Sequence, residues 1–112
     1  MSADIASLMD IRGAIDRALE FASGLNFERF SCDPRTMWAI YIQIIVIGEA
    51  ANRVSQEFQQ RHPALPWKKM IPMRHRLVHD YDEVDWVQVW DTVVSDLPML
   101  KAAIEPLIPK EP

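Results

Sequence analysis

The sequence contains almost no cysteine and little glycine. Its 112 residues include one cysteine, Cys32, and three glycines. A single cysteine excludes an intramolecular disulfide and a thiolate metal cluster, so we expect a reducing, cytoplasmic setting. The scarcity of glycine and the lack of alternating apolar and polar residues argue against a β-sheet. The amino terminus has no basic cluster leading into an apolar run, so no signal peptide is expected.

Long apolar runs are absent as well. The longest runs from Met37 to Ile47 and is interrupted only by Gln43, whereas a membrane-spanning helix needs about 20 apolar residues. The length suits one domain, 1–112, and the apolar share of 49% is typical of a globular protein. A helix that is apolar all round is buried on more than one side. In so small a domain we expect part of it to face a second copy in a homodimer.

Apolar residues recur at helical spacing through the first half of the chain. A first helix is expected over 3–23, ended by Gly24. A loop over 24–32, which contains two phenylalanines, then leads to Asp33-Pro34. Aspartate at the N-cap and proline at the first helical position are typical of a helix start. This second helix is expected to continue to about Arg61.

Prolines interrupt the second half. A third helix is expected over 66–79, where Pro72 must kink or interrupt it because its ring removes a backbone donor. Asp85 caps a fourth helix, with Gln88 completing a partial capping box, and Pro98 should bend this helix midway. Together the segments predict an all-α antiparallel bundle of four to five helices.

Positive charge is concentrated in one stretch. The chain carries a net charge of −4, but residues 53–79 carry +5 and contain all three histidines, whereas 1–52 carry −3 and 80–112 carry −6. A local field of one sign steers anions even on an acidic protein. From charge alone, a solvated basic face and a phosphate-binding face both remain open. The candidate RNA contacts are Arg53, Lys68, Lys69 and Arg76.

The residues suited to chemistry lie in the segment 74–81. It reads Arg-His-Arg-Leu-Val-His-Asp-Tyr. The guanidinium of arginine matches phosphate oxygens, and histidine gives or takes a proton near neutrality. Such groups can cleave an RNA phosphodiester without a metal. A base takes the proton of the 2′-hydroxyl, an acid protonates the departing oxygen, and a cation stabilises the charge on the phosphate.

Spacing leaves alternatives open in this segment. Arg74 and His79 are five residues apart, so on an ideal helix they point about 140° away from each other. They can converge through the long arginine side chain, at a helix end, or in a cleft between two chains. His79 could instead cap a helix C-terminus. His75 and His79 share a helix face, but the cation Arg76 lies between them and no third ligand is near, so we expect no metal site and no cofactor.

The pattern Arg-x4-His-x-Tyr, filled by Arg74, His79 and Tyr81, resembles the signature of the HepT-like toxins within the HEPN ribonuclease superfamily. Residues 47–51, Ile-Gly-Glu-Ala-Ala, resemble the IGEAA segment of that family. Further matches follow in family order: Pro66-Trp67, Met73-Arg74, 77–81, 84–90 and Asp96-Leu97-Pro98. One departure is His75, since the family most often has asparagine there. It leaves open whether His75 or His79 carries more of the proton transfer.

The resemblance implies a helical homodimer whose active cleft lies where two copies meet. It implies a metal-independent endoribonuclease, the toxin of a type VII-like HepT–MntA toxin–antitoxin pair, with tRNA as one candidate substrate. By position, Arg74 would hold the scissile phosphate and His79 would act as general base or acid. Tyr81 would receive AMP from an MntA-type minimal nucleotidyltransferase antitoxin, which would place a bulky anion where RNA must bind. Taken alone, Tyr81 would be interpreted as an ordinary half-buried aromatic residue of a loop.

Two further hypotheses remain. Glu49, on the long apolar helix, could pair with Arg74 and orient it, or could be a helix-surface glutamate. The alternative to a ribonuclease is a non-catalytic helical module that binds a nucleotidyltransferase partner, a nucleotide or RNA without cleaving. The presence of Arg74, His79 and Tyr81 together favours the ribonuclease.

Overall fold

All regular structure in the described part of the chain is helical. The computed structural model describes residues 2–75 and 83–110. The elements are α1 (Ala3–Ala22), α2 (Phe27–Ser31), α3 (Pro34–Arg53), α4 (Gln56–Arg61), α5 (Trp67–Met70), α7 (Trp86–Asp91), the π-helix η2 (Thr92–Asp96), α8 (Leu97–Ile104) and the 3-10 helix η3 (Glu105–Leu107). The predicted all-α class is confirmed.

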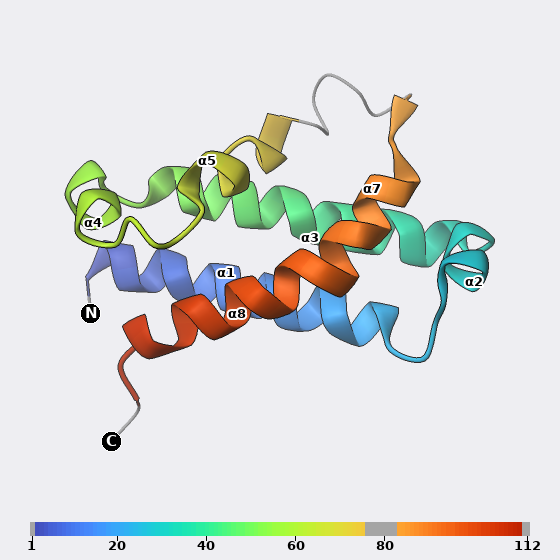
Figure 1. The fold of residues 1–112 in the computed structure, drawn as a ribbon, viewed down its shortest axis with the longest axis horizontal. Coiled ribbons are helices and arrows are strands. Elements are labelled where there is room, and N and C mark those ends of the chain that lie inside the picture. The colour runs from blue at the N-terminus through green and yellow to red at the C-terminus, as the bar shows by residue number, and fades with distance from the viewer. Residues whose placement is uncertain (1, 76–82, 111–112) are drawn as a thin grey trace.

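Helices α1 and α3 run antiparallel along the molecule, and the continuous run of α7, η2 and α8 crosses them, with α8 against α1 (Figure 1). Their facing stripes form the core, in which Leu8, Ile11 and Ile15 of α1 and Ile40 and Ile47 of α3 are fully buried. Burial of each such side chain contributes about 1.5–3 kcal/mol. None of the helices described is both long enough and apolar enough to cross a bilayer.

The predicted start of α3 and end of α1 are confirmed. The Asp33 carboxylate accepts hydrogen bonds from the Thr36 backbone N–H at 3.3 Å and the Thr36 hydroxyl at 2.7 Å. The hydroxyl bond, followed by the backbone one, lowers the pKa of Asp33. Helix α1 ends at Ala22, and Gly24 follows in the left-handed conformation at φ 78°, which glycine adopts without steric cost.

The expected loop over 24–32 is wrong, because it contains the short helix α2. The side chain of Asn26 accepts from the Arg29 backbone N–H at 2.9 Å and so starts the helix. Phe30 is fully buried in this helix, with its ring 4.9 Å from that of Trp90. Burial of this aromatic ring against α7 outweighs the weak helical tendency of so short a segment.

The expected continuation of the second helix to Arg61 is also wrong. Helix α3 ends at Arg53, and α4 begins after Ser55. The Asp4 carboxylate accepts from the Ser55 backbone N–H at 2.8 Å and from its hydroxyl at 2.7 Å. These two bonds, the backbone one being the stronger influence, lower the pKa of Asp4. Ser55 in turn caps α4 by accepting from the Phe58 N–H at 3.1 Å, so a contact from α1 breaks the helix.

The prolines interrupt the helices of the second half, as expected, but the bounds of these helices differ from the expected ones. Helix α5 is only four residues long and Pro72 lies just beyond it, so the single helix over 66–79 is wrong within the described residues. Asp85 caps α7 by accepting from the Gln88 backbone N–H at 3.1 Å. The Gln88 side chain donates to Thr92 Oγ1 at 3.4 Å rather than back to Asp85. Before Pro98, the helix widens into η2.

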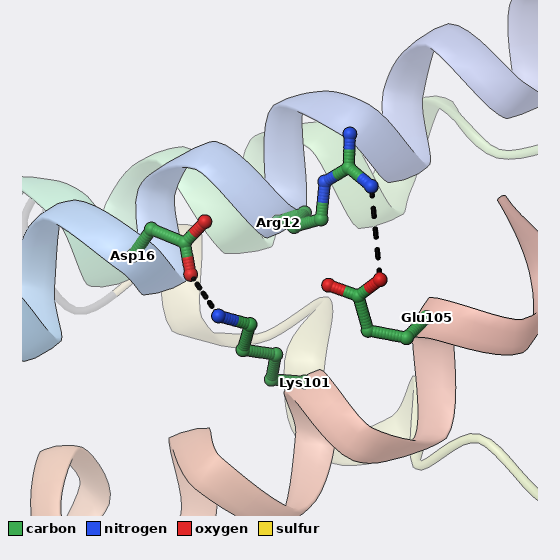
Figure 2. Close-up of polar contacts among 4 residues, drawn as sticks. All are labelled: Arg12, Asp16, Lys101 and Glu105. Atoms are coloured by element: carbon green, nitrogen blue, oxygen red, sulfur yellow. Dashed lines mark ion pairs between the residues drawn. The ribbon is translucent and has the colours of Figure 1, made fainter. Parts of the chain in front are cut away.

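Two ion pairs join α1 to the C-terminal helix (Figure 2). Lys101 Nζ lies 2.7 Å from Asp16 Oδ1, and Arg12 Nη1 lies 3.7 Å from Glu105 Oε2. The hydrogen bond to Asp16 raises the pKa of Lys101. Both pairs reach solvent, so water and salt screen them. One pair joins α1 to α8 and the other joins α1 to η3.

Candidate active site

Helix α3 positions Arg74 through direct backbone contact. A Cβ atom placed on Gly48 would lie 2.3 Å from the Arg74 backbone N and 3.0 Å from its Cα and Cβ. Any residue other than glycine would therefore collide with the Arg74 backbone. Gly48 is buried in the C-terminal half of α3, in the helix interior, where glycine otherwise costs about 1 kcal/mol relative to alanine. The close approach explains why glycine occupies this position.

The side chain of Arg74 is partly buried, and its Nε atom is buried without an acceptor among the described residues. An unsatisfied buried donor costs about 1–3 kcal/mol. Such groups call for a functional explanation when they occur in a native protein. A phosphate oxygen is the acceptor that best suits a guanidinium, since the bond is charge-assisted and can be bidentate.

Two of the predicted supporting residues are sequence neighbours of Arg74 and Gly48. His75 follows Arg74 and is exposed, and Glu49 follows Gly48 on α3 and is also exposed. The ion pairs among the described residues do not include one between Glu49 and Arg74. The catalytic-support roles of His75 and Glu49 therefore stay predictions.

The other residues of the motif, Arg76, His79 and Tyr81, lie outside the described residues. Their roles in RNA binding, proton transfer and adenylylation stay predictions. No group of three histidine, cysteine, aspartate or glutamate residues that could hold a metal ion occurs in residues 2–75 and 83–110.

The predicted RNA-binding residues differ in their surroundings. Arg53 forms an ion pair with Asp10 at 3.0 Å, which partly neutralises its charge. Lys68 and Lys69 are exposed on α5. These two lysines also line a cavity of about 340 Å³ beside the segment that leads to Arg74. The basic stretch thus divides into a paired arginine and two lysines at a cavity.

Another wall of this cavity contains Gln88, Thr92 and Asp96. The sequence predicted no role at the site for any of them, although Gln88 was expected in a capping box and Asp96 lies in a segment that resembles the family. Their signal in the sequence was a row of polar residues spaced by four in a segment that is otherwise largely apolar. Only the structure shows that this row faces the lysines of α5.

Comparison with known proteins assigns the chain to a family. The profile of the family described as "Ribonuclease HepT-like" matches residues 11–107. The chain belongs to this family. The matched range includes both Gly48 and Arg74, so the contact between α3 and the motif arginine lies within the family domain. Membership supports a ribonuclease, while the details of catalysis are taken up below.

Curated relatives agree with this assignment. The chain is 40% identical over 100 residues to the probable ribonuclease HepT of Thermococcus cleftensis, covering 89% of this chain and 91% of the relative. Proteins named "putative RNase" are similar as well. One, from Caldanaerobacter subterraneus subsp. tengcongensis, is 32% identical over 93 residues, with 83% of each chain covered. Another, from Methanocaldococcus jannaschii, is 30% identical over 103 residues, covering 92% of this chain and 89% of the relative. No solved structure matches the chain significantly.

Proposed function

We propose that the chain is a metal-independent endoribonuclease that acts as a toxin, with Arg74 and His79 as its catalytic residues. The observation that carries the proposal is the environment of Arg74. Its buried Nε has no acceptor among the described residues, and its backbone packs directly against Gly48. A purely structural arginine would be expected to have its buried donors satisfied.

The chemistry requires no metal. A base removes the proton of the ribose 2′-hydroxyl, and the resulting oxygen attacks the adjacent phosphorus. The bond to the 5′-oxygen breaks, and an acid protonates that oxygen. The products are a 2′,3′-cyclic phosphate and a 5′-hydroxyl. Arg74 stabilises the charge on the phosphate, while His79 carries the base or acid role, with His75 as the second candidate for proton transfer.

A homodimer completes this proposal. On α3, Trp38 is 41% exposed and Ile42, one turn later, is 43% exposed, while Val87 of α7 is 56% exposed. Exposed apolar side chains on neighbouring elements favour burial against another protein surface. A two-fold pairing through this face is the simplest closed arrangement. It would also bring together groups from two chains, which removes the limit that a five-residue spacing sets within one helix.

Regulation is proposed through Tyr81. A nucleotidyltransferase antitoxin of the MntA type would transfer AMP to its phenolic oxygen. The added phosphate is an anion beside a site that must bind RNA phosphate, so cleavage would stop. Intact mass tests this directly, since each AMP adds ~329 Da at a phenolic oxygen.

Incubation of the purified full chain with RNA in the presence of EDTA tests the catalytic proposal. We expect cleavage that persists with the chelator and is lost in Arg74→Ala and in His79→Ala. Arg29→Ala is the matched control, since Arg29 is exposed on α2, and it should cleave RNA like the wild-type chain. Absence of cleavage by protein shown to carry no AMP would refute the enzyme and favour the binding module. Loss of the fold in Arg74→Ala would indicate a structural arginine instead.

A further inference from the structure

A cavity of about 340 Å³ lies next to the backbone that leads to Arg74. Ile44, which lines it, is one turn before Gly48 on α3, or about 6 Å along the helix. Pro72 and Met73, the two residues that precede Arg74, also line it. The volume falls at the small end of the range for ligand pockets in proteins. The cavity therefore has room for one small group attached to a phosphate held by Arg74.

One wall of the cavity is a polar row on α7 and η2, made of Gln88, Thr92 and Asp96. On an α-helix, residues eight apart diverge by about 80°. The π-helical bond from the Leu97 N–H to the Thr92 carbonyl widens this turn, which takes up part of that divergence. Thr92 Oγ1 donates to the Gln88 carbonyl at 2.8 Å and accepts from Gln88 Nε2 at 3.4 Å. This pair of bonds orients the Gln88 amide at the cavity wall.

The charged side chains that line the cavity form no salt bridge among the described residues. Lys68 and Lys69 contribute from α5, and Asp96 contributes from η2. Lysine ammonium groups can meet a phosphate, whereas an ionised carboxylate only accepts hydrogen bonds. The cavity thus offers cations, a carboxylate acceptor and an amide that both donates and accepts.

We propose that this cavity binds a nucleobase of the RNA strand adjacent to the phosphate held by Arg74, and that it selects bases with an exocyclic amino group. The proposal rests on the ribonuclease function. Asp96 accepts a hydrogen bond from the amino group of adenine, cytosine or guanine. Uracil has no exocyclic amino group, and its ring N3–H lies between two carbonyl oxygens that repel a carboxylate, so it is the weaker partner for Asp96. The Gln88 amide contributes a second hydrogen bond to the base, and Lys68 and Lys69 contact flanking phosphate.

Titration of the full chain with the four ribonucleoside 3′-monophosphates tests the proposal, with the Gln88 side-chain amide followed by nuclear magnetic resonance. We expect the adenosine, cytidine and guanosine nucleotides to bind about tenfold more tightly than the uridine nucleotide. Inorganic phosphate alone should leave the Gln88 signal in place. Asp96→Asn replaces one acceptor oxygen by a donor, so it should reduce the preference to less than about threefold. Asp91→Asn, the same change on α7 away from the cavity, should retain it.

Equal binding of all four nucleotides, or an unchanged preference in Asp96→Asn, would overturn the base site. Failure of every nucleotide to move the Gln88 signal would overturn it as well, as expected if a second copy of the chain fills the cavity. RNA cleavage by the same preparations keeps the two proposals apart. Base-selective binding without cleavage refutes the ribonuclease and leaves the base site, whereas cleavage without selective binding refutes the base site alone.

Discussion

Replacement of Gly48 by alanine tests whether α3 positions Arg74, the arginine that we propose is catalytic. The added Cβ would meet the Arg74 backbone N at 2.3 Å, while comfortable contacts between such atoms lie near 3.5 Å or beyond, so Arg74 must retreat by about 1 Å. A displacement of this size at a catalytic group costs about 10²-fold in rate. We therefore expect RNA cleavage to fall about a hundredfold.

The stability of Gly48→Ala should change much less than its activity. Alanine gains about 1 kcal/mol of helix propensity over glycine, whereas the collision costs about 1–3 kcal/mol. The two terms offset each other in part, so the free energy of unfolding should fall by no more than about 2 kcal/mol. Thermal unfolding followed by circular dichroism measures this, and cleavage is then compared at a temperature where both proteins are folded.

Gly13→Ala is the matched control within the same molecule. A Cβ at Gly13 would lie 3.3 Å from Arg17 Nη1, the end of a flexible side chain that can move. This variant should cleave RNA at the wild-type rate, and its free energy of unfolding should rise by up to about 1 kcal/mol. The reasoning is refuted if folded Gly48→Ala cleaves within twofold of the unmodified chain, or if both alanine variants lose activity equally.

The remaining predictions concern stability and assembly. Ser55→Ala removes the cap of α4 and a bond to Asp4, so thermal unfolding should show a loss of about 1 kcal/mol, and an unchanged melting temperature would count against the cap. The lowered pKa of Asp4 means that its contribution is present above the ordinary value near 3.9 and is lost as the pH falls through the lower folded value. Asp4→Ala should therefore flatten the decline of stability below about pH 4, as checked by urea unfolding across that range. Ile42→Glu should halve the mass measured in solution by light scattering, while Met99→Glu, at a side chain 74% exposed on α8, should leave the dimer intact; a dimer in both would refute the proposed face.

The sequence predicted those parts of the fold that depend on local signals. Helix α1, its glycine stop and the Asp33-Pro34 start of α3 follow from spacing and capping within a few residues. The break at Ser55 was missed because it depends on Asp4, 51 positions earlier. The helix that buries Phe30 has a local signal only in its Asn26 cap, and it was missed because the Phe30 ring packs on Trp90, far along the chain. Contacts of that range leave no local pattern.

The same distinction applies to the site. Arg74 was predicted because a guanidinium in a histidine-rich segment suits phosphate chemistry. The role of Gly48 could not be predicted, since its reason is a backbone 26 positions away that approaches within contact distance. Asp96 carried only a weak signal, a polar residue in an apolar helix. Its relation to Lys68 and Lys69 appears only in the structure, where residues of α5 and η2 line the same cavity.

The π-helical turn at Thr92–Asp96 fixes the register between the two ends of the last long helical run. Such a turn holds one residue more than an ordinary turn while the two flanking parts keep nearly the same relative rotation. If the same residues kept ordinary i→i+4 bonding instead, the part of the run before them would rotate by about 100° relative to the part after them. Trp90 would then leave Phe30. The widened turn therefore allows the aromatic end and the aliphatic end of this run to be packed at the same time.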